Sequence, residues 1–174
     1  MDLTENASLD YARDMFLISF YLRGMPFVDM VYLKKKDLQN GFVRYCRQKT
    51  AQRLIIQWET HMQSIMEKYP ENATQYLLPI ITIEDGTERK QYCRKGLFIN
   101  RKLKMIGNMV GLNIPLSMYV ARHSWASAAR DKNVPLSVIS KALGHDSETT
   151  TQIYLSSIKT SIVDQANEKI LKEL

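Results

Sequence analysis

The sequence contains few of the residues that mark disulfide-rich, fibrous or disordered proteins. Only two cysteines, Cys46 and Cys93, occur in 174 residues, which is too few for a disulfide framework and favours a reducing cytoplasm. Glycine (7) and proline (5) are sparse, which excludes collagen-like and low-complexity chains. The hydrophobic share of 45% is enough to fill a core, so we expect one globular domain over residues 1–174.

Long hydrophobic runs and a secretory signal are also missing. No apolar run approaches the roughly 18 residues that a membrane helix requires, so we expect no membrane span. The N-terminus, MDLTENASLDYARD, is acidic and polar, whereas a signal peptide starts with basic residues followed by an apolar stretch. Both absences agree with a cytoplasmic location.

Acidic residues are absent from a long central stretch. No Asp or Glu occurs from Arg89 to Arg130, and basic residues accumulate there in a chain whose net charge is +6. A second basic run extends from Lys34 to Arg53 and is interrupted only by Asp37. This asymmetry is typical of a face that binds a polyanion, with nucleic acid as the first candidate. A solvated basic surface would give the same composition.

The hydrophobic periodicity predicts a mostly helical chain with one small antiparallel sheet. The expected helices span residues 8–22, 27–33, 59–69, 91–111, 117–131, 135–143, 146–154 and 157–173. Ser8 is the expected N-cap of the first helix, and residues 82–91 are expected to form an exposed loop. The pair Asn40-Gly41 is a strong hairpin signal. The expected strands lie near residues 36–39, 42–47 and 53–58.

One predicted helix carries an arginine at the edge of its apolar face. In residues 117–131, Met118, Ala121 and Trp125 form the stripe that faces the core, and Arg122 borders it. A half-buried arginine usually has an anionic partner, because an unpaired guanidinium is costly to remove from water. The partner can be an internal carboxylate, although the flanking sequence supplies none.

Two further polar residues follow at defined distances from Arg122. Gly144 is expected to end a helix and to display His145 beside the start of the next one. His145 follows Arg122 by 23 residues and precedes Tyr154 by nine. Taken alone, a loop histidine is usually surface and a tyrosine is usually a packed ring, so their meaning depends on the combined spacing.

Arg122, the triplet Leu143-Gly144-His145 and Tyr154 together resemble the C-terminal signature of the tyrosine recombinase (phage integrase) family. The family motif consists of His-x-x-Arg, Leu-Gly-His and a nucleophilic tyrosine, and the resemblance covers about residues 8 to 170. It implies a catalytic domain that is mostly α with a small antiparallel three-stranded sheet. It also implies site-specific DNA recombination through a 3′-phosphotyrosine intermediate, with no metal, cofactor or small-molecule substrate.

The resemblance extends to three more catalytic positions. Arg23 follows a helix and matches the first arginine of the family, with a structural ion pair to Asp29 as the alternative reading. Asp29 lies six rather than three residues after Arg23, but it keeps the eight-residue spacing to Asp37, so it matches the acidic position. Lys49 falls in the turn between the second and third strands and matches the catalytic lysine. Contact with the DNA backbone alone is the alternative for Lys49.

The sequence departs from the family pattern at one position. The histidine of His-x-x-Arg is replaced by Tyr119, and a phenol with a pKa near 10 is a poor proton acceptor at neutral pH. We therefore expect this role to be weakened, altered, or shared with Asp29 or His145. The adjacent His123 points about a quarter-turn away on the helix and is expected to be structural.

The implied roles follow from the chemistry of phosphodiester exchange. Tyr154 would attack phosphorus, and Arg23 and Arg122 would stabilise charge on the non-bridging oxygens. Lys49 would protonate the leaving 5′-oxygen, and His145 would donate a hydrogen bond to a non-bridging oxygen. The residues expected to contact the DNA backbone are Lys34, Lys36, Arg47, Arg94, Lys95, Arg101, Lys102 and Lys104.

The resemblance also implies partners. Double-stranded DNA is the expected substrate, on which the chain would self-associate into a synaptic tetramer near the bacterial nucleoid. The last predicted helix has apolar positions at Ile158, Ile162, Ala166 and Ile170, which would dock on a second copy or on the same domain.

Three expectations concern the limits of the resemblance. Family members usually carry an N-terminal DNA-binding domain that nothing here resembles, so residues 1–174 are expected to form the catalytic domain alone. A type IB topoisomerase that relaxes DNA is the first alternative function. A DNA-binding module with an impaired site is the second, and Tyr119 motivates it.

Overall fold

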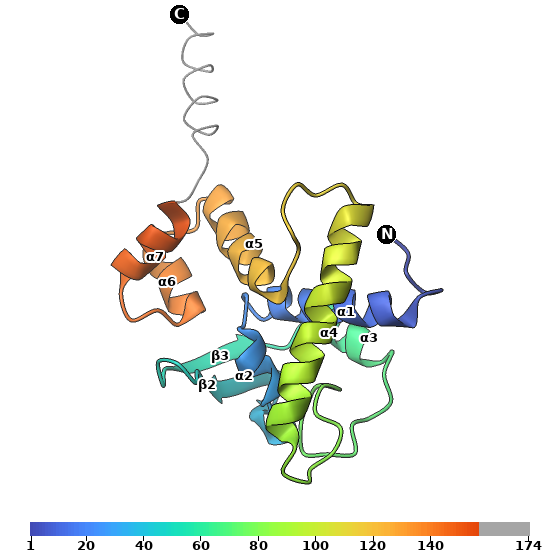
Figure 1. The fold of residues 1–174 in the computed structure, drawn as a ribbon. Coiled ribbons are helices and arrows are strands. Elements are labelled where there is room, and N and C mark those ends of the chain that lie inside the picture. The colour runs from blue at the N-terminus through green and yellow to red at the C-terminus, as the bar shows by residue number, and fades with distance from the viewer. Residues whose placement is uncertain (157–174) are drawn as a thin grey trace, which may run out of the picture.

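Residues 1–156 are described here from a computed structural model of the chain (Figure 1). Its helices are α1 (Ala7–Tyr21), α2 (Phe27–Val31), α3 (Thr60–Met66), α4 (Glu88–Met109), α5 (Met118–Asp131), α6 (Leu136–Leu143) and α7 (Glu148–Ser156). The mostly helical fold with one small antiparallel sheet is confirmed. Within residues 1–156, no helix combines the length and the apolar character that a bilayer span requires.

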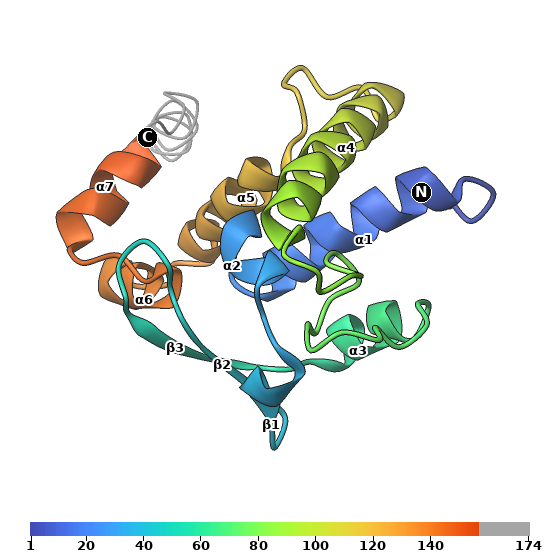
Figure 2. The same cartoon turned by 60° about the horizontal axis from the view of Figure 1, so that its bottom comes forward.

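The sheet has three antiparallel strands in the order β1-β2-β3. The strands are β1 (Leu38–Gln39), β2 (Phe42–Cys46) and β3 (Arg53–Gln57). Asn40 and Gly41 join the first two strands with φ angles of 51° and 74°, as a tight hairpin turn requires, so the predicted hairpin is confirmed. The β2–β3 turn, residues 47–52, lies at the other end of β2 and approaches α6 (Figure 2).

Several predicted boundaries are wrong by a few residues. Lys35–Asp37 form a short 3₁₀ helix, so the first strand begins at Leu38 rather than near residue 36. The N-cap of α1 is Asn6, whose Oδ1 accepts the backbone N–H of Leu9, and the Ser8 hydroxyl donates to the same oxygen. Asparagine is at least as good a cap as serine, so the earlier residue takes the position. Helix α4 begins at Glu88, inside the predicted loop, because an acidic residue in the first turn is favourable there. The helix predicted over residues 157–173 lies outside the described residues.

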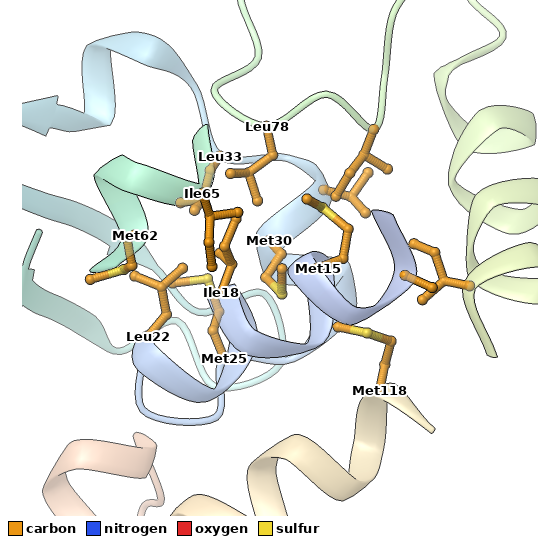
Figure 3. Close-up of a cluster of buried hydrophobic side chains, with 14 of the residues drawn as sticks. Met15, Ile18, Leu22, Met25, Met30, Leu33, Met62, Ile65, Leu78 and Met118 are labelled. Atoms are coloured by element: carbon orange, nitrogen blue, oxygen red, sulfur yellow. The ribbon is translucent and has the colours of Figure 1, made fainter. Parts of the chain in front are cut away.

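Most buried apolar side chains form one large cluster between α1, α2, α3, α4 and the sheet (Figure 3). Met15 and Ile18 of α1 and its C-cap residue Leu22 recur at helical spacing in the sequence, and each is at most 1% exposed. Met25 and Met30 fill the space beside them. Methionine suits these irregular gaps because its unbranched side chain adapts to its neighbours.

A separate small cluster joins the last three helices. Its buried members are Ala126, Ala129, Ile139, Leu143 and Leu155, which come from α5, α6 and α7. The first residue of α5, Met118, belongs to the large cluster instead. Helix α5 therefore spans the boundary between the two clusters, and we call this boundary the seam.

The large cluster meets α5 at a very close approach between Gly24 and Arg122. A Cβ on Gly24 would lie 2.5 Å from the Cα of Arg122, and Gly24 has a φ of +68°. Glycine adopts this left-handed conformation without steric cost and leaves room for the neighbouring backbone. The end of α1 can therefore pack directly against α5 at the seam.

Candidate active site

A cavity of about 990 Å³ opens at the seam. Several residues that line this cavity have roles predicted from the sequence. They are Arg47, Lys49, Tyr119, Arg122, His145 and Tyr154. Helices α2 and α4 contribute much of the remaining wall, including Phe27, Tyr92, Gly96 and Leu97. The fold therefore brings together residues from the β2–β3 turn, α5, the loop after α6, and α7.

Arg122 is buried at the centre of this arrangement, with only 5% of its surface exposed. Its Nη1 donates to the carbonyl oxygen of Gly24 at 2.9 Å, and its Nη2 donates to the carbonyl of Leu143. Burial and the positive charge of Arg47 lower the pKa of Arg122 to about 10. The sequence predicts a half-buried arginine with an anionic partner. The structure buries it fully and gives it carbonyl partners from both sides of the seam.

His145 lies between Arg122 and α7. Its Nε2 is 3.1 Å from Nη2 of Arg122, and its Nδ1 is 2.8 Å from Oγ1 of Thr151. A guanidinium only donates, so Nε2 accepts this hydrogen bond and we assign the ring hydrogen to Nδ1. Burial, aided by the charges of Arg122 and Arg47, lowers the pKa of His145 to about 4. The imidazole is therefore neutral at pH 7.

Tyr154 projects from α7 among three other rings. Its ring stacks on that of His123, with 4.3 Å between centroids and 5° between planes. Tyr119 and His145 approach the same ring edge-on, with centroids 6.5 Å and 5.8 Å away. Burial raises the pKa of Tyr154 above its ordinary value. The phenol is thus held in place and protonated, and any attack by its oxygen requires a proton acceptor.

His123 contacts Tyr154, and the sequence does not predict this contact. The sequence predicts that His123 points away from Arg122 and has a structural role, and His123 does not line the cavity. It nevertheless supports one face of the Tyr154 ring, and its ring lies 4.4 Å from that of Tyr119. The sequence signal that could have predicted the contact between His123 and Tyr119 is their spacing, because residues four apart lie on one face of a helix.

The β2–β3 turn carries Lys49 to the cavity. The turn is attached to the segment after α6, because the side-chain amide of Gln52 donates to the carbonyl of His145 and to the carboxylate of Asp146. The turn is also attached to α2, because Oδ1 of Asp29 accepts a hydrogen bond from the backbone N–H of Gln48 at 3.0 Å. Lys49 is exposed and lines the cavity. These contacts hold the turn so that Lys49 lines the same cavity as Arg122 and Tyr154.

Asp29 and Arg23, two predicted catalytic residues, do not line the cavity. Asp29 is buried beneath the turn, where its Oδ2 lies 4.0 Å from Nε of Arg47, and burial raises its pKa. Arg23 is half-buried at the end of α1. Over residues 1–156 no ion pair joins Arg23 to Asp29, so Asp29 pairs with Arg47 instead.

The predicted backbone-binding residues do not form a single surface. Arg94, Arg101 and Lys104 are exposed on α4. Lys95 and Lys102 of the same helix are half-buried. Their ammonium groups rest over the rings of Tyr11 and Phe98, at 5.2 Å and 5.8 Å respectively.

The remaining three residues of that group are also separated. Lys34 and Lys36 precede β1, and β1 pairs with the end of β2 that lies away from the β2–β3 turn. Arg47 is only 7% exposed and lies inside the cavity wall rather than on a solvated face.

Comparison with known proteins gives this arrangement a family context. Residues 1–160 match the phage integrase family. The chain is 26% identical over 166 residues to the tyrosine recombinase XerD of Staphylococcus epidermidis, which covers 92% of this chain and 55% of that protein. It is 29% identical over 147 residues to the tyrosine recombinase XerC of Rickettsia bellii, covering 84% and 46%. The chain spans about half the length of these curated relatives.

Solved structures share the fold. The crystal structure of XerA recombinase superposes with a TM-score of 0.62 at 18% identity, over 97% of this chain and 62% of that one. The XerH site-specific recombinase bound to its difH substrate gives 0.63 at 20% identity, over 93% and 47%. At such identities the likeness concerns the fold alone. The match over residues 1–160 makes this chain a member of the phage integrase family, as the spacing of Arg122, His145 and Tyr154 predicts.

Proposed function

We propose that this chain cleaves and rejoins double-stranded DNA in site-specific recombination, through a 3′-phosphotyrosine formed at Tyr154. The observation that carries the proposal is the presence of Tyr154, Arg122, His145 and Lys49 around one cavity. The relatives named tyrosine recombinases support the same reaction class.

The proposed step exchanges one phosphorus–oxygen bond for another. The phenolic oxygen of Tyr154 attacks the scissile phosphorus, and the bond from phosphorus to the 5′-oxygen breaks. Arg122 stabilises the negative charge that develops on the non-bridging oxygens, and the ammonium of Lys49 gives a proton to the leaving 5′-oxygen. Attack by the 5′-hydroxyl of another strand reverses the step and rejoins the DNA. Guanidinium charge takes the place of a metal ion in this scheme.

The phenolic proton needs an acceptor, because burial raises the pKa of Tyr154. Nε2 of His145 carries no hydrogen and accepts a hydrogen bond from Nη2 of Arg122, whereas Asp29 lies beneath the turn and outside the lining. We assign the proton to Nε2 of His145, which can take it once Nη2 of Arg122 turns from the imidazole to the phosphate. Tyr119 lines the cavity with 62% of its surface exposed, and we assign it a hydrogen bond to the phosphate.

Binding of the duplex is assigned to the exposed basic side of α4 and to the cavity. Arg94, Arg101 and Lys104 would neutralise backbone phosphates, which makes the affinity fall steeply as salt rises. Assembly into a synaptic tetramer near the nucleoid is part of the proposal. The apolar positions assigned to that assembly, Ile158, Ile162, Ala166 and Ile170, lie outside the described residues.

Covalent trapping tests the proposed function directly. The chain is incubated at low salt, with EDTA, with a pool of nicked duplexes of randomised sequence. The nick lets the short 5′-hydroxyl fragment diffuse away, so a covalent protein–DNA adduct accumulates and its DNA can be sequenced. We expect an adduct with the natural chain and with Tyr119→Phe, at a reduced rate, and none with Tyr154→Phe.

Other outcomes contradict the proposal or change it. An adduct that persists in Tyr154→Phe would exclude Tyr154 as the nucleophile. A chain that retards the same DNA on a native gel without forming an adduct would support the impaired DNA-binding module. Relaxation of a supercoiled plasmid that lacks the selected sequence would favour the topoisomerase reading over recombination.

A further inference from the structure

We propose that Thr151 is a positioning residue that holds the imidazole hydrogen of His145 on Nδ1, so that Nε2 is the nitrogen that takes the proton of Tyr154. The inference rests on the proposed function, in which His145 is that proton acceptor. Thr151 lies on α7, three residues before Tyr154, and none of its surface is exposed. Its Oγ1 is 2.8 Å from Nδ1 of His145.

The backbone fixes the base of the His145 side chain but not the direction of its ring. Gly144 ends α6 with a φ of 64°, and the backbone N–H of His145 donates to the carbonyl of Ser140 at 3.1 Å. The ring can still turn about its side-chain bonds. Its direction therefore depends on the partners of its two nitrogens, which are Nη2 of Arg122 and Oγ1 of Thr151.

The contact with Arg122 is given up during the proposed reaction. Nη2 of Arg122 leaves Nε2 when it turns to the phosphate, and the contact between Nδ1 and Thr151 then holds the ring. A hydroxyl oxygen accepts a hydrogen bond from Nδ1–H both before Nε2 takes the proton and after it has done so. A carboxylate has this task in the Ser-His-Asp triad, where the wrong tautomer of the histidine severely slows the reaction.

The residue that orients the proton acceptor and the nucleophile lie on the same helix. Residues three apart in a helix face the same side, so Thr151 and Tyr154 approach His145 together. The rings of Tyr154 and His145 are 5.8 Å apart between centroids. Docking of α7 therefore brings the nucleophile into the site and sets the tautomer of its proton acceptor in one movement.

Two reciprocal substitutions separate the hydroxyl of Thr151 from its bulk. Thr151→Val keeps the branched shape and replaces the hydroxyl with a methyl group, whereas Thr151→Ser keeps the hydroxyl and loses the methyl. On the duplex recovered by trapping, we expect Thr151→Val to slow adduct formation roughly 10–100-fold and Thr151→Ser to stay within about threefold of the natural rate. Thr149→Val is the matched control, because it makes the same change at an exposed position of α7, and it should stay near the natural rate.

A loss in Thr151→Ser with full activity in Thr151→Val would overturn the proposal, because Thr151 would then act through packing alone. A double variant makes a second test. His145→Gln alone should slow adduct formation roughly 10²–10⁴-fold, and adding Thr151→Val should slow it no further, since Thr151 acts through His145. A further loss as large as that of Thr151→Val alone would also overturn the proposal.

Nuclear magnetic resonance of the DNA-free chain, labelled with ¹⁵N, reports the tautomer directly. The sequence has three histidines, so substitution of each one assigns the imidazole signals. We expect a hydrogen on Nδ1 of His145 and none on Nε2 in the natural chain and in Thr151→Ser, and loss of the Nδ1 hydrogen signal in Thr151→Val. If Thr151→Val fails to fold, Thr151→Ala takes its place with the same expectation.

A hydrogen on Nε2 in the natural chain would overturn the proposal, as would an unchanged Nδ1 hydrogen signal in Thr151→Val. These spectra require no cleavage of DNA. Failure of the natural chain to form an adduct would therefore contradict the proposed function, and it is distinguishable from failure of Thr151 to position His145.

Discussion

The large and small clusters differ in size and in what they contribute to the site. The large cluster supports the sheet, α2 and α4, and with them the β2–β3 turn that carries Arg47 and Lys49. The small cluster has five buried members and supports α7, which carries Tyr154. Lys49, which we assign to protonate the leaving oxygen, thus belongs to the better-packed region, and the nucleophile belongs to the other.

Arg122 connects the two regions. One of its nitrogen atoms is bonded to Gly24 at the edge of the large cluster, and another to Leu143 in the small one. Regions with few buried apolar contacts open at lower free energy than the main core of a protein. The comparison therefore predicts that α7 and Tyr154 can be released from the site while the rest of the fold persists.

A substitution that forces α1 and α5 apart at the seam should reduce the free energy of unfolding more than any other change considered. Gly24→Ala places a Cβ 2.5 Å from the Cα of Arg122 at a φ of +68°, so α1 and α5 must separate. We expect a loss of roughly 3–5 kcal/mol in the free energy of unfolding, measured by urea denaturation. Gly41→Ala is the matched control, since it has a φ of +74° and no neighbouring atom within 4 Å. It should lose only about 1–2 kcal/mol, and equal losses in both variants would refute the seam contact.

Substitutions that create a cavity in one cluster or the other should distinguish unfolding of the whole chain from local unfolding. Met30→Ala in the large cluster and Ile139→Ala in the small one each remove a fully buried side chain, with an expected cost of about 2–4 kcal/mol. Hydrogen exchange followed by mass spectrometry distinguishes them. Met30→Ala should lower protection throughout the chain, whereas Ile139→Ala should lower it in α6 and α7 and spare α1. Uniform loss in both variants would mean that the clusters unfold as one unit.

Lowering the pH should have a smaller effect on the free energy of unfolding, through protonation of His145. Its pKa is about 4 in the folded chain against an ordinary 6.5, so the unfolded chain binds more protons between these values. The stability due to the neutral imidazole is fully present above pH 6.5 and is lost as pH falls toward 4. His145→Gln should flatten the pH dependence of the unfolding free energy over this window. An unchanged pH dependence in His145→Gln would contradict this prediction.

The smallest effect should come from the ring that supports Tyr154. His123→Ala removes the stacked imidazole, and we expect a loss of about 0.5–1.5 kcal/mol together with faster exchange in α7. His123→Phe keeps a flat ring of similar size and should lose less. If the two variants lose equal stability, the stacking does not hold α7.

Local signals in the sequence were sufficient for much of the fold. The turn at Asn40-Gly41, the stripe of α1 and the glycine that ends α6 each depend on neighbours within a few residues. The same holds for the family signature, because His145 and Tyr154 follow Arg122 along one short segment. Such features are legible because propensity and periodicity act over one turn or one hairpin.

The place of Arg47 could not be predicted in this way. Its position in a basic run resembles that of many surface residues, and its carbonyl partner on Gly144 is 97 residues away. Asp14 is a similar case, since an acid in a polar N-terminal segment is buried here against Lys68 and Tyr69. Side chains whose burial depends on distant partners leave no periodic trace in the sequence.

The long separations within the site have a consequence for how the protein is made. The hydrogen bonds from Arg122 to Gly24 and from Arg47 to Gly144 close loops of 98 and 97 residues. Contacts of such high sequence separation form late, after local helices and hairpins. During synthesis the large cluster can assemble while α6 and α7 are still inside the ribosome. A nascent chain therefore has no tyrosine beside Arg122 until α7 has emerged and packed, and the proposed cleavage cannot begin before that point.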